Sequence, residues 1–354
     1  MTICYFGIYN PDYSRNRIYI SGLRANGIEV IECSDRSRGL MKYFKLIAKH
    51  RLVNGKYDAM IVGYPGYTVV WLARLLTGKP IIYDALCTHY EAQVLSRGIY
   101  PLWSPRRWMT YFYDHSSVHF ADQVLVETEA QKKYFEHLFK TPPNKVKVLL
   151  AGADDKEFFP EAVEKNGRFS VVFRGRFLPE IGIRYIVEAA NILQSDDIDF
   201  LIIGNGHGPV VKELHDAIKR FNPTNLAVES SYLPADGLRQ MMLRGHVLLG
   251  QFADHDRLKR TIPYKAFEAL ALSMPFITSR AEGHTGFLVD GTNCLLVNPA
   301  DAKDLAEKIK HLKDHPDISA TIAKNGHELF LREATPKVLG KILAGYVSES
   351  LPKS

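Results

Sequence analysis

An apolar run that ends on a glycine between two arginines stands near the middle of the chain, Val171-Val172-Phe173-Arg174-Gly175-Arg176-Phe177. Two later segments also predict a strand that closes onto a helix, Leu201-Ile202-Ile203-Gly204-Asn205-Gly206 and Thr261-Ile262-Pro263-Tyr264-Lys265-Ala266-Phe267-Glu268-Ala269-Leu270-Ala271. In an open α/β sheet, ligands bind at the carboxyl ends of the strands, where helix amino termini offer N–H groups to phosphates. Bases for the phosphates and a glutamate for sugar hydroxyls suit a nucleoside diphosphate derivative.

The size of the chain predicts two domains. A chain of 354 residues suits two cores of about 150–180 residues each. The four cysteines are scattered and form no C-x-x-C pair, which favours a reducing cytosol over a zinc site or a disulfide framework. The first residues indicate a strand rather than a signal peptide, and we expect a cytoplasmic protein with no membrane-spanning helix.

Short apolar strands alternate with helical patterns in both halves, which predicts an α/β protein with parallel sheets covered on both faces. The expected strands are 3–7, 27–32, 59–62, 80–84, 123–127 and 146–150, then 170–173, 200–203, 226–229, 247–249 and 275–278. The expected helices are 18–24, 40–52, 129–139, 182–193, one that begins at Pro263 with Thr261 as its cap, and one from about 335 to 351.

Two runs resemble the signatures of the family 4 glycosyltransferases: residues 175–182 followed by 185–190, and residues 262–275. The resemblance implies the GT-B fold, in which two Rossmann-like doubly wound domains face a central cleft, and sugar transfer with retention of configuration. It places an acceptor-binding domain at residues 1–160 and a donor-nucleotide-binding domain at 168–335, with a polar linker between them. A helix at about 336–354 is expected to pack back on the first domain.

The same resemblance implies the donor site. It assigns Arg176 to the diphosphate and Glu268 to the ribose hydroxyls, because a carboxylate has two acceptor oxygens. The whole predicted donor-binding set is Arg174, Gly175, Arg176, Gly204, Gly206, Tyr232, Arg260, Ile262, Pro263, Lys265 and Glu268.

The chain departs from the family pattern at three positions. Ile181 stands where a lysine is usual, so one phosphate-binding cation is missing; the candidates to replace it are Lys265, Arg260 and Arg257. Arg260 stands where many relatives have a second glutamate that touches the donor sugar. Gly286 stands where another glutamate is frequent. The sugar is therefore left open.

In the first domain, polar residues follow the strand that ends at Asp84. We expect Asp84, His89 or Glu91 to position the acceptor hydroxyl as catalytic residues, and the alternative is a helix-capping Asp84 with surface neighbours. The predicted acceptor-binding residues are Arg15, Asn16, Arg17, Thr88 and Tyr90.

Positive charge is concentrated in the first half. Residues 1–150 contain 20 Lys and Arg against 12 Asp and Glu, whereas the remainder is slightly acidic. Lys42, Lys45 and Lys49 align on one predicted helix face, and residues 100–108 mix aromatic side chains with arginines. Such surfaces suit an anionic membrane, although a charge run is usually only a solvated face. No nucleic-acid-binding motif accompanies these charges, so we expect no nucleic-acid partner.

The sequence therefore predicts a retaining glycosyltransferase that needs no cofactor or metal and uses a UDP- or GDP-linked sugar. The expected acceptor is a glycan or lipid-linked glycan, in surface-glycan assembly on the inner face of the cell membrane. Two alternatives stay open: an epimerase or hydrolase of nucleotide sugars with the same fold, and a catalytically silent scaffold that docks at membranes.

Overall fold

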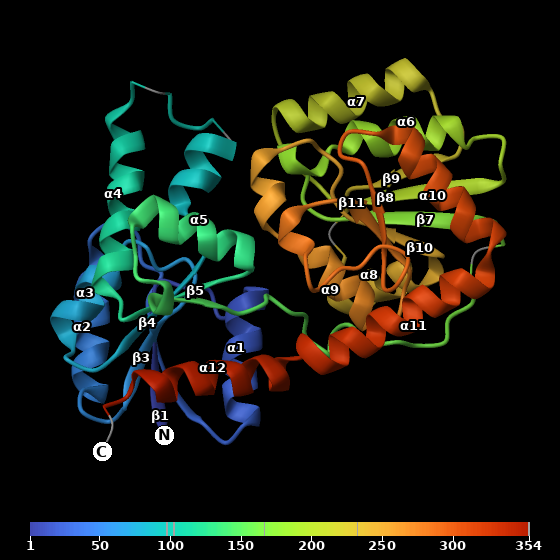
Figure 1. The fold of residues 1–354 in the computed structure, drawn as a ribbon. Coiled ribbons are helices and arrows are strands. Elements are labelled where there is room, and N and C mark those ends of the chain that lie inside the picture. Colours follow the sequence, from blue (N-terminus) through green and yellow to red (C-terminus); the bar gives the residue numbers. More distant parts are fainter. Residues whose placement is uncertain (97, 102, 166, 232, 353–354) are drawn as a thin grey trace. The chain divides into compact units, whose positions relative to one another are not determined.

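The computed structural model describes residues 1–96, 98–101, 103–165, 167–231 and 233–352. They form two compact units, which are drawn in Figure 1. Unit 1 comprises residues 1–154 together with the final segment from Ala334, and unit 2 comprises Asp155–Glu333. Among the described residues, no helix is long and apolar enough to cross a bilayer.

Unit 1 contains a six-stranded parallel sheet in the order β2-β1-β3-β4-β5-β6. Its strands are β1 (Thr2–Gly7), β2 (Glu29–Ser34), β3 (Ala59–Val62), β4 (Ile81–Leu86), β5 (Gln123–Val126) and β6 (Val146–Val148). Its helices are α1 (Ser14–Ala25), α2 (Met41–Val53), α3 (Val70–Leu76), the π-helix η1 (Glu91–Ser96), α4 (Pro105–Phe120), α5 (Glu129–Phe139), η2 (Pro143–Lys145) and α12 (Pro336–Ser350). Strands β3 and β4 are buried throughout, as expected for parallel strands covered on both faces.

Helix α12 belongs to unit 1 because it packs closely on α1. A Cβ added to Gly22 would lie 2.0 Å from the carbonyl oxygen of Pro336, so only glycine allows this approach. Asn26 donates a hydrogen bond of 2.8 Å to the carbonyl of Lys337, and the Tyr346 hydroxyl donates one of 2.8 Å to the carbonyl of Val148. The chain therefore returns to its first unit after completing the second.

Unit 2 repeats the plan with the strand order β12-β11-β10-β7-β8-β9, again parallel. Its strands are β7 (Phe169–Arg174), β8 (Ile198–Ile203), β9 (Leu226–Glu229), β10 (Val247–Leu249), β11 (Phe276–Ser279) and β12 (Leu295–Val297). Its helices are η3 (Pro179–Ile181), α6 (Ile183–Ile192), α7 (Pro209–Phe221), α8 (Ala235–Arg244), η4 (Asp256–Arg260), α9 (Tyr264–Ala271), η5 (Glu282–His284), α10 (Ala302–Asp314) and α11 (Pro316–Glu333).

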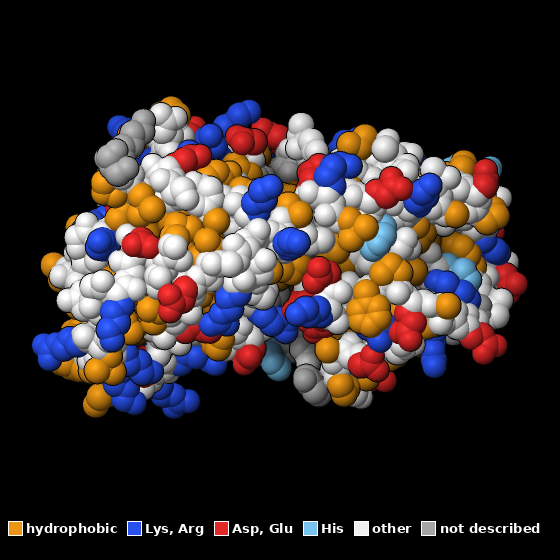
Figure 2. All heavy atoms as spheres, turned by 90° about the horizontal axis from the view of Figure 1, so that it is seen from below, with side chains coloured by type: hydrophobic (Ala, Val, Ile, Leu, Met, Phe, Trp, Pro, Cys, Tyr) orange, Lys and Arg blue, Asp and Glu red, His pale blue; other side chains and the backbone are white. Residues whose placement is uncertain are grey.

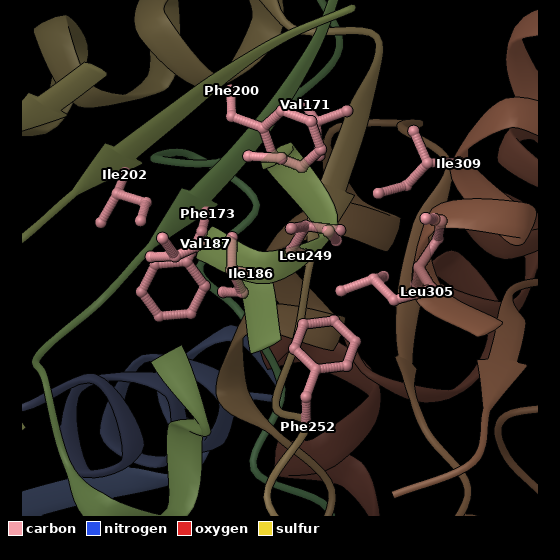
Figure 3. Packing of buried hydrophobic residues seen from close by; sticks show 14 of the residues in the cluster. Val171, Phe173, Ile186, Val187, Phe200, Ile202, Leu249, Phe252, Leu305 and Ile309 are labelled. Carbon is pink, nitrogen blue, oxygen red and sulfur yellow. The ribbon is translucent and has the colours of Figure 1, made fainter. Parts of the chain in front are cut away.

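The core of unit 2 lies between the sheet and helices α6, α7 and α10. Figure 3 shows Val171 and Phe173 of β7 among Ile186 and Val187 of α6 and other apolar side chains of this cluster. Because side chains alternate along a strand, the residue after Phe173 points to the other face of the sheet. Arg174 is thereby directed toward α9.

The structure differs from the sequence prediction at the domain boundary. Residues 155–165 belong to unit 2 and are tied to it, because Glu161 forms an ion pair with Arg239 and Lys165 donates to the carbonyl of Leu243 at 2.8 Å. The stretch expected to be a linker is therefore anchored by charged side chains.

The predicted start of α9 is also wrong. The helix begins at Tyr264, so Pro263 occupies the N-cap position, and Thr261 does not cap this helix but ends η4, where its N–H donates to the carbonyl of Leu258. Strand β12 was not predicted, because three apolar residues carry too weak a pattern.

Candidate nucleotide-sugar site

Two glycines bring the ends of β7 and β8 into contact. A Cβ added to Gly204 would lie 1.9 Å from the carbonyl oxygen of Gly175, and both glycines have a φ of +149°. The Gly175 N–H donates to the carbonyl of Ile203 at 2.9 Å, and the Phe177 N–H donates to the carbonyl of Asn205 at 2.7 Å. The predicted donor loops around residues 175 and 204 therefore form one continuous edge.

An ion pair joins this edge to α9. Arg174 donates to Glu268 Oε1, although the two residues are 94 positions apart in the sequence. Burial raises the pKa of the Glu268 carboxyl, and the positive charges of Arg174 and Lys265 oppose that shift. Both side chains keep unused hydrogen-bonding capacity, because Arg174 Nε and Glu268 Oε2 are buried and have no hydrogen-bond partner among the described residues. Buried polar atoms in proteins are usually hydrogen-bonded, so these two atoms could accept further partners.

Lys265 lies over the glycine of the first loop. A Cβ on Gly175 would be 2.6 Å from Lys265 Cε, and Lys265 Nζ is 5.2 Å from the ring centroid of Phe173. Burial and the nearby charge of Arg174 lower the pKa of Lys265 to about 8, whereas Glu268 and Glu180 favour its charged form. Lys265 is half-buried, so its amine lies near the protein surface.

The other predicted donor residues occupy different environments. Arg176 is exposed, and no contact to its side chain is found among the described residues. Gly206 lies against Phe177, while Ile262 and Pro263 are buried just before α9. Tyr232 lies outside the described residues. Lys265 and Glu268 are thus brought together with Arg174 and Gly175, whereas Arg176 reaches into solvent.

The two arginines proposed as substitutes for the missing family lysine each pair with a carboxylate. Ile181 is fully buried in the core of unit 2. Arg257 forms an ion pair of 2.9 Å with the buried Glu180, and Arg260 forms one of 2.9 Å with Asp256. Because a carboxylate faces each arginine, Lys265 is the candidate that best fits the role.

Sequence reasoning did not identify His284. This residue of η5 is buried, and burial lowers the pKa of its imidazole to about 4, although a hydrogen bond to the backbone of Thr261 acts in the opposite direction. The neighbouring Gly283 lies against the backbone of Arg260. A neutral His284 therefore supports the chain just before α9, and a lone histidine followed by threonine gives no sequence signal of that role.

In unit 1, Asp84 and Arg15 form a fully buried ion pair. The distance from Arg15 Nη2 to Asp84 Oδ1 is 2.8 Å, and neither side chain is exposed. Arg15 also donates to the carbonyl of Leu149, and its guanidinium lies 4.7 Å from the ring centroid of Tyr19. This geometry gives both residues a structural explanation, and it does not support the catalytic role of Asp84 or the acceptor-binding role of Arg15.

Asn16 and Arg17 are also used by the protein itself. Asn16 is fully buried, accepts a hydrogen bond from the Tyr5 hydroxyl at 3.0 Å and donates to the carbonyl of Tyr64 at 2.7 Å. Arg17 forms an ion pair of 3.1 Å with Asp154. Their acceptor-binding roles stay predictions without support from these contacts.

The backbone of the segment after β4 is hydrogen-bonded to Asp114, a residue that the sequence analysis did not identify. Asp114 of α4 accepts hydrogen bonds from the backbone N–H groups of His89 at 3.0 Å and Tyr90 at 2.7 Å. Burial raises the pKa of Asp114 to about 7, although those two N–H groups oppose the shift. The His89 ring stacks on Tyr67 at 3.9 Å between centroids.

The remaining candidates of this segment are less accessible. Thr88 and Glu91 are buried, and Thr88 Oγ1 accepts a hydrogen bond from the Glu91 N–H at 2.9 Å. Glu91 Oε2 accepts one from Gln131 at 3.2 Å. Arg107 donates to the Tyr90 hydroxyl at 2.7 Å. Of the three predicted catalytic residues, the half-buried His89 is the one whose side chain is most available to a substrate.

Part of the chain matches a known protein family. Residues 168–315 match the family described as glycosyl transferases group 1. These residues include the loop after β7, the loop after β8 and the whole of α9. The matched residues all lie within unit 2.

Curated relatives are distant. The chain is 24% identical over 227 residues to a glycosyltransferase of Methanocaldococcus jannaschii. The aligned region covers 62% of this chain and 57% of that protein. It is 22% identical over 289 residues to the alpha-D-kanosaminyltransferase of Streptomyces kanamyceticus, covering 79% of this chain and 73% of that enzyme. The aligned regions thus span between about half and three quarters of these relatives.

Solved structures establish the fold. The Anabaena protein HepE in complex with UDP superposes with a TM-score of 0.73 at 16% identity, and the match covers 99% of this chain and 100% of HepE. Sucrose-phosphate synthase of Thermosynechococcus elongatus gives a TM-score of 0.75 at 15% identity, covering 99% and 98% of the two chains. The predicted two-domain GT-B fold is confirmed.

The buried ion pair of unit 1 yields a stability prediction. Asp84→Asn leaves the Arg15 charge buried without its partner, and loss of one member of such a pair costs about 3–5 kcal/mol of unfolding free energy. Denaturant unfolding of the native and Asp84→Asn proteins measures this loss of unfolding free energy. The control is Asp197→Asn, which removes an exposed carboxylate that pairs with Arg168 at 2.9 Å and should cost less than about 1 kcal/mol. An Asp84→Asn protein of native stability that had lost transferase activity would instead support a catalytic Asp84.

The pKa of Lys265 yields a pH prediction. Below its pKa of about 8 the amine is charged and attracts a diphosphate, and the charge is lost as the pH rises through 8. Affinity for UDP or GDP should therefore fall about fivefold to tenfold between pH 7 and pH 9 in titration calorimetry, because one pKa unit corresponds to about 1.36 kcal/mol. Lys265→Arg should remove this dependence. Equal affinity of the native protein at both pH values would exclude Lys265 from diphosphate binding.

Proposed function

We propose that the chain is a glycosyltransferase that binds a nucleoside diphosphate sugar on unit 2. The observation that carries the proposal is the ion pair between half-buried Arg174 and buried Glu268, in which each side chain has a buried atom without a hydrogen-bond partner among the described residues. A ribose diol presents hydroxyl donors that a carboxylate oxygen can accept. Glu268 Oε2 is then the acceptor for the ribose, and the charge of Arg174 favours the ionised form of this carboxylate against the effect of burial.

The neighbouring groups suit a diphosphate. Lys265 lies directly over Gly175, and the glycine-rich turns after β7 and β8 allow a ligand to approach the backbone closely. A cation at this position stabilises the negative charge that develops on the leaving diphosphate. Exposed Arg176 adds a second cation next to the same loop. The donor is a UDP- or GDP-linked sugar, for which these residues supply the charge without a metal ion.

The reaction class follows from the resemblance to the family 4 enzymes. We infer transfer with retention, in which the leaving phosphate helps to take the proton of the acceptor hydroxyl on the same face of the sugar. The acceptor is a glycan or a lipid-linked glycan. Relatives of similar distance include a capsular polysaccharide biosynthesis glycosyltransferase of Staphylococcus aureus and a putative colanic acid biosynthesis glycosyltransferase of Escherichia coli, which fits surface-glycan assembly at the inner face of a membrane.

The nucleotide assignment is tested by an isosteric substitution. Glu268→Gln keeps the shape of the side chain but removes the charge that strengthens the ribose hydrogen bonds. Calorimetry with UDP and with GDP should show a loss of about 1.5–3 kcal/mol for the nucleotide that the native protein binds.

A matched control separates this effect from the loss of any helical glutamate. Glu328 is an exposed residue of α11 in the same unit and faces Lys324 at 3.9 Å. Glu328→Gln should leave the affinity unchanged. Unchanged affinity in Glu268→Gln would refute the ribose assignment, and failure of the native protein to bind any nucleoside diphosphate would refute the proposed function.

Retention and metal independence are tested together. Transfer to a glycan acceptor should continue in excess chelator, because Lys265 and Arg176 supply the positive charge at the diphosphate. The anomeric proton of the product should have the same configuration as that of the donor by NMR. An absolute need for Mg²⁺ or Mn²⁺, or an inverted product, would contradict this mechanism. Release of free sugar or an epimerised nucleotide without acceptor would identify a hydrolase or an epimerase.

A further inference from the structure

Helix α4 of unit 1 buries mostly polar residues and exposes large aromatic ones. Three of its four buried residues are polar, namely Thr110, Asp114 and Ser117. Its exposed residues include Trp108 and Phe112, which lie one helical turn apart and are 68% and 65% exposed. A helix at the surface of a globular domain normally turns its apolar side toward the core. This arrangement therefore needs a separate explanation.

The buried polar groups of α4 are satisfied within unit 1. Asp114 accepts the N–H groups of His89 and Tyr90, and the Ser117 hydroxyl donates to the carbonyl of Tyr67 at 2.7 Å. The Thr110 hydroxyl donates to the carbonyl of Arg107 at 2.6 Å. The inward polar side chains of α4 thus hold the segment after β4 and the carbonyl of Tyr67.

The outward face continues beyond the start of the helix. Trp103, one residue before the N-cap, is 83% exposed. Figure 1 shows the first turns of α4 rising beyond the strands of unit 1. The exposed apolar side chains at the start of the helix, which we call the α4 tip, are Trp103, Trp108, Met109 and Phe112. Exposed apolar groups gathered in this way mark an interaction site.

The charges around the α4 tip select the kind of partner. Residues 92–113 contain three arginines and no aspartate or glutamate. Arg106 is exposed, and the guanidinium of Arg107 lies 5.9 Å from the ring centroid of Trp108. Tryptophan is enriched at the boundary between lipid tails and head groups, and arginine can bury its stem while its charge stays with the phosphates.

We propose that the α4 tip inserts into the head-group region of an anionic lipid bilayer. Trp103, Trp108 and Phe112 enter the apolar boundary, and the exposed Arg106 meets the lipid phosphates. The proposal concerns unit 1 alone and is independent of nucleotide binding on unit 2. It gives the glycosyltransferase proposed above a fixed contact with the surface on which a lipid-linked acceptor would lie.

The lysines that the sequence suggested for this purpose are less suitable. Lys49 forms an ion pair of 3.0 Å with Asp35, and Lys45 donates to the Ser37 hydroxyl at 2.8 Å. Figure 2 shows Lys and Arg side chains gathered at the left end of unit 1, where Figure 1 draws α2 and α3. Part of this positive charge is therefore already used within the protein, and we assign it long-range attraction rather than insertion.

Vesicle sedimentation tests the proposal. The full chain should bind vesicles that contain phosphatidylglycerol at 100 mM salt, and the triple variant Trp103→Ser, Trp108→Ser and Phe112→Ser should bind at least tenfold more weakly. The control is Ile192→Ser, Val289→Ser and Leu331→Ser, which removes three exposed apolar residues of unit 2 and should bind like the native chain. Thermal unfolding and nucleotide titration verify that each variant is folded.

Fluorescence distinguishes insertion from attraction by charge. The chain has three tryptophans, so Trp71→Phe leaves only the two of the α4 tip. Brominated lipids should quench the tryptophan emission of this variant. A triple variant with Lys42→Glu, Lys45→Glu and Lys49→Glu should lose less vesicle binding than the variant with the three tip substitutions. Lack of binding by the native chain, equal binding by the tip variant, or absence of quenching would each overturn the proposal. Loss of a native dimer in the tip variant, without vesicle binding by either protein, would identify a protein interface instead.

Discussion

The ion pair between Arg174 and Glu268 is the constraint that organises the candidate site. It connects the end of β7 to the second turn of α9 and places a carboxylate at the sheet edge where ligands bind in this class of fold. A buried carboxylate is costly without a partner, and Arg174 supplies the compensating charge. Arg174 Nε and Glu268 Oε2 have no hydrogen-bond partner among the described residues, and we propose that the nucleotide supplies one.

The glycines give this pair its surroundings. Gly175 and Gly204 allow the loops after β7 and β8 to touch, and Lys265 occupies the space where a side chain on Gly175 would stand. A larger residue at either position would push the loops apart and displace the lysine. The chemistry of the site therefore depends on backbone shape as much as on the three charged side chains, and the close packing of the core in Figure 3 supports that shape.

The sequence predicted the alternating fold, but not the internal pairing of charges, and the donor site stays a prediction. Glu268 and Lys265 could be placed on one helix face because their spacing is local. The pairing of Arg15 with Asp84 and of Arg174 with Glu268 could not be predicted, since each depends on which strand ends lie beside which helix. The polar inner face of α4 was not predicted either. Helical periodicity locates a buried face by its apolar residues, and the buried residues of α4 are mostly polar.

A crystal structure with a bound UDP- or GDP-linked sugar tests the central claim most directly. The account predicts that the ribose hydroxyls lie within hydrogen-bonding distance of Glu268 Oε2, with the diphosphate beside Gly175 and Lys265 Nζ. A nucleotide bound elsewhere on the chain, or one bound here with Glu268 still contacting Arg174 alone, would contradict it.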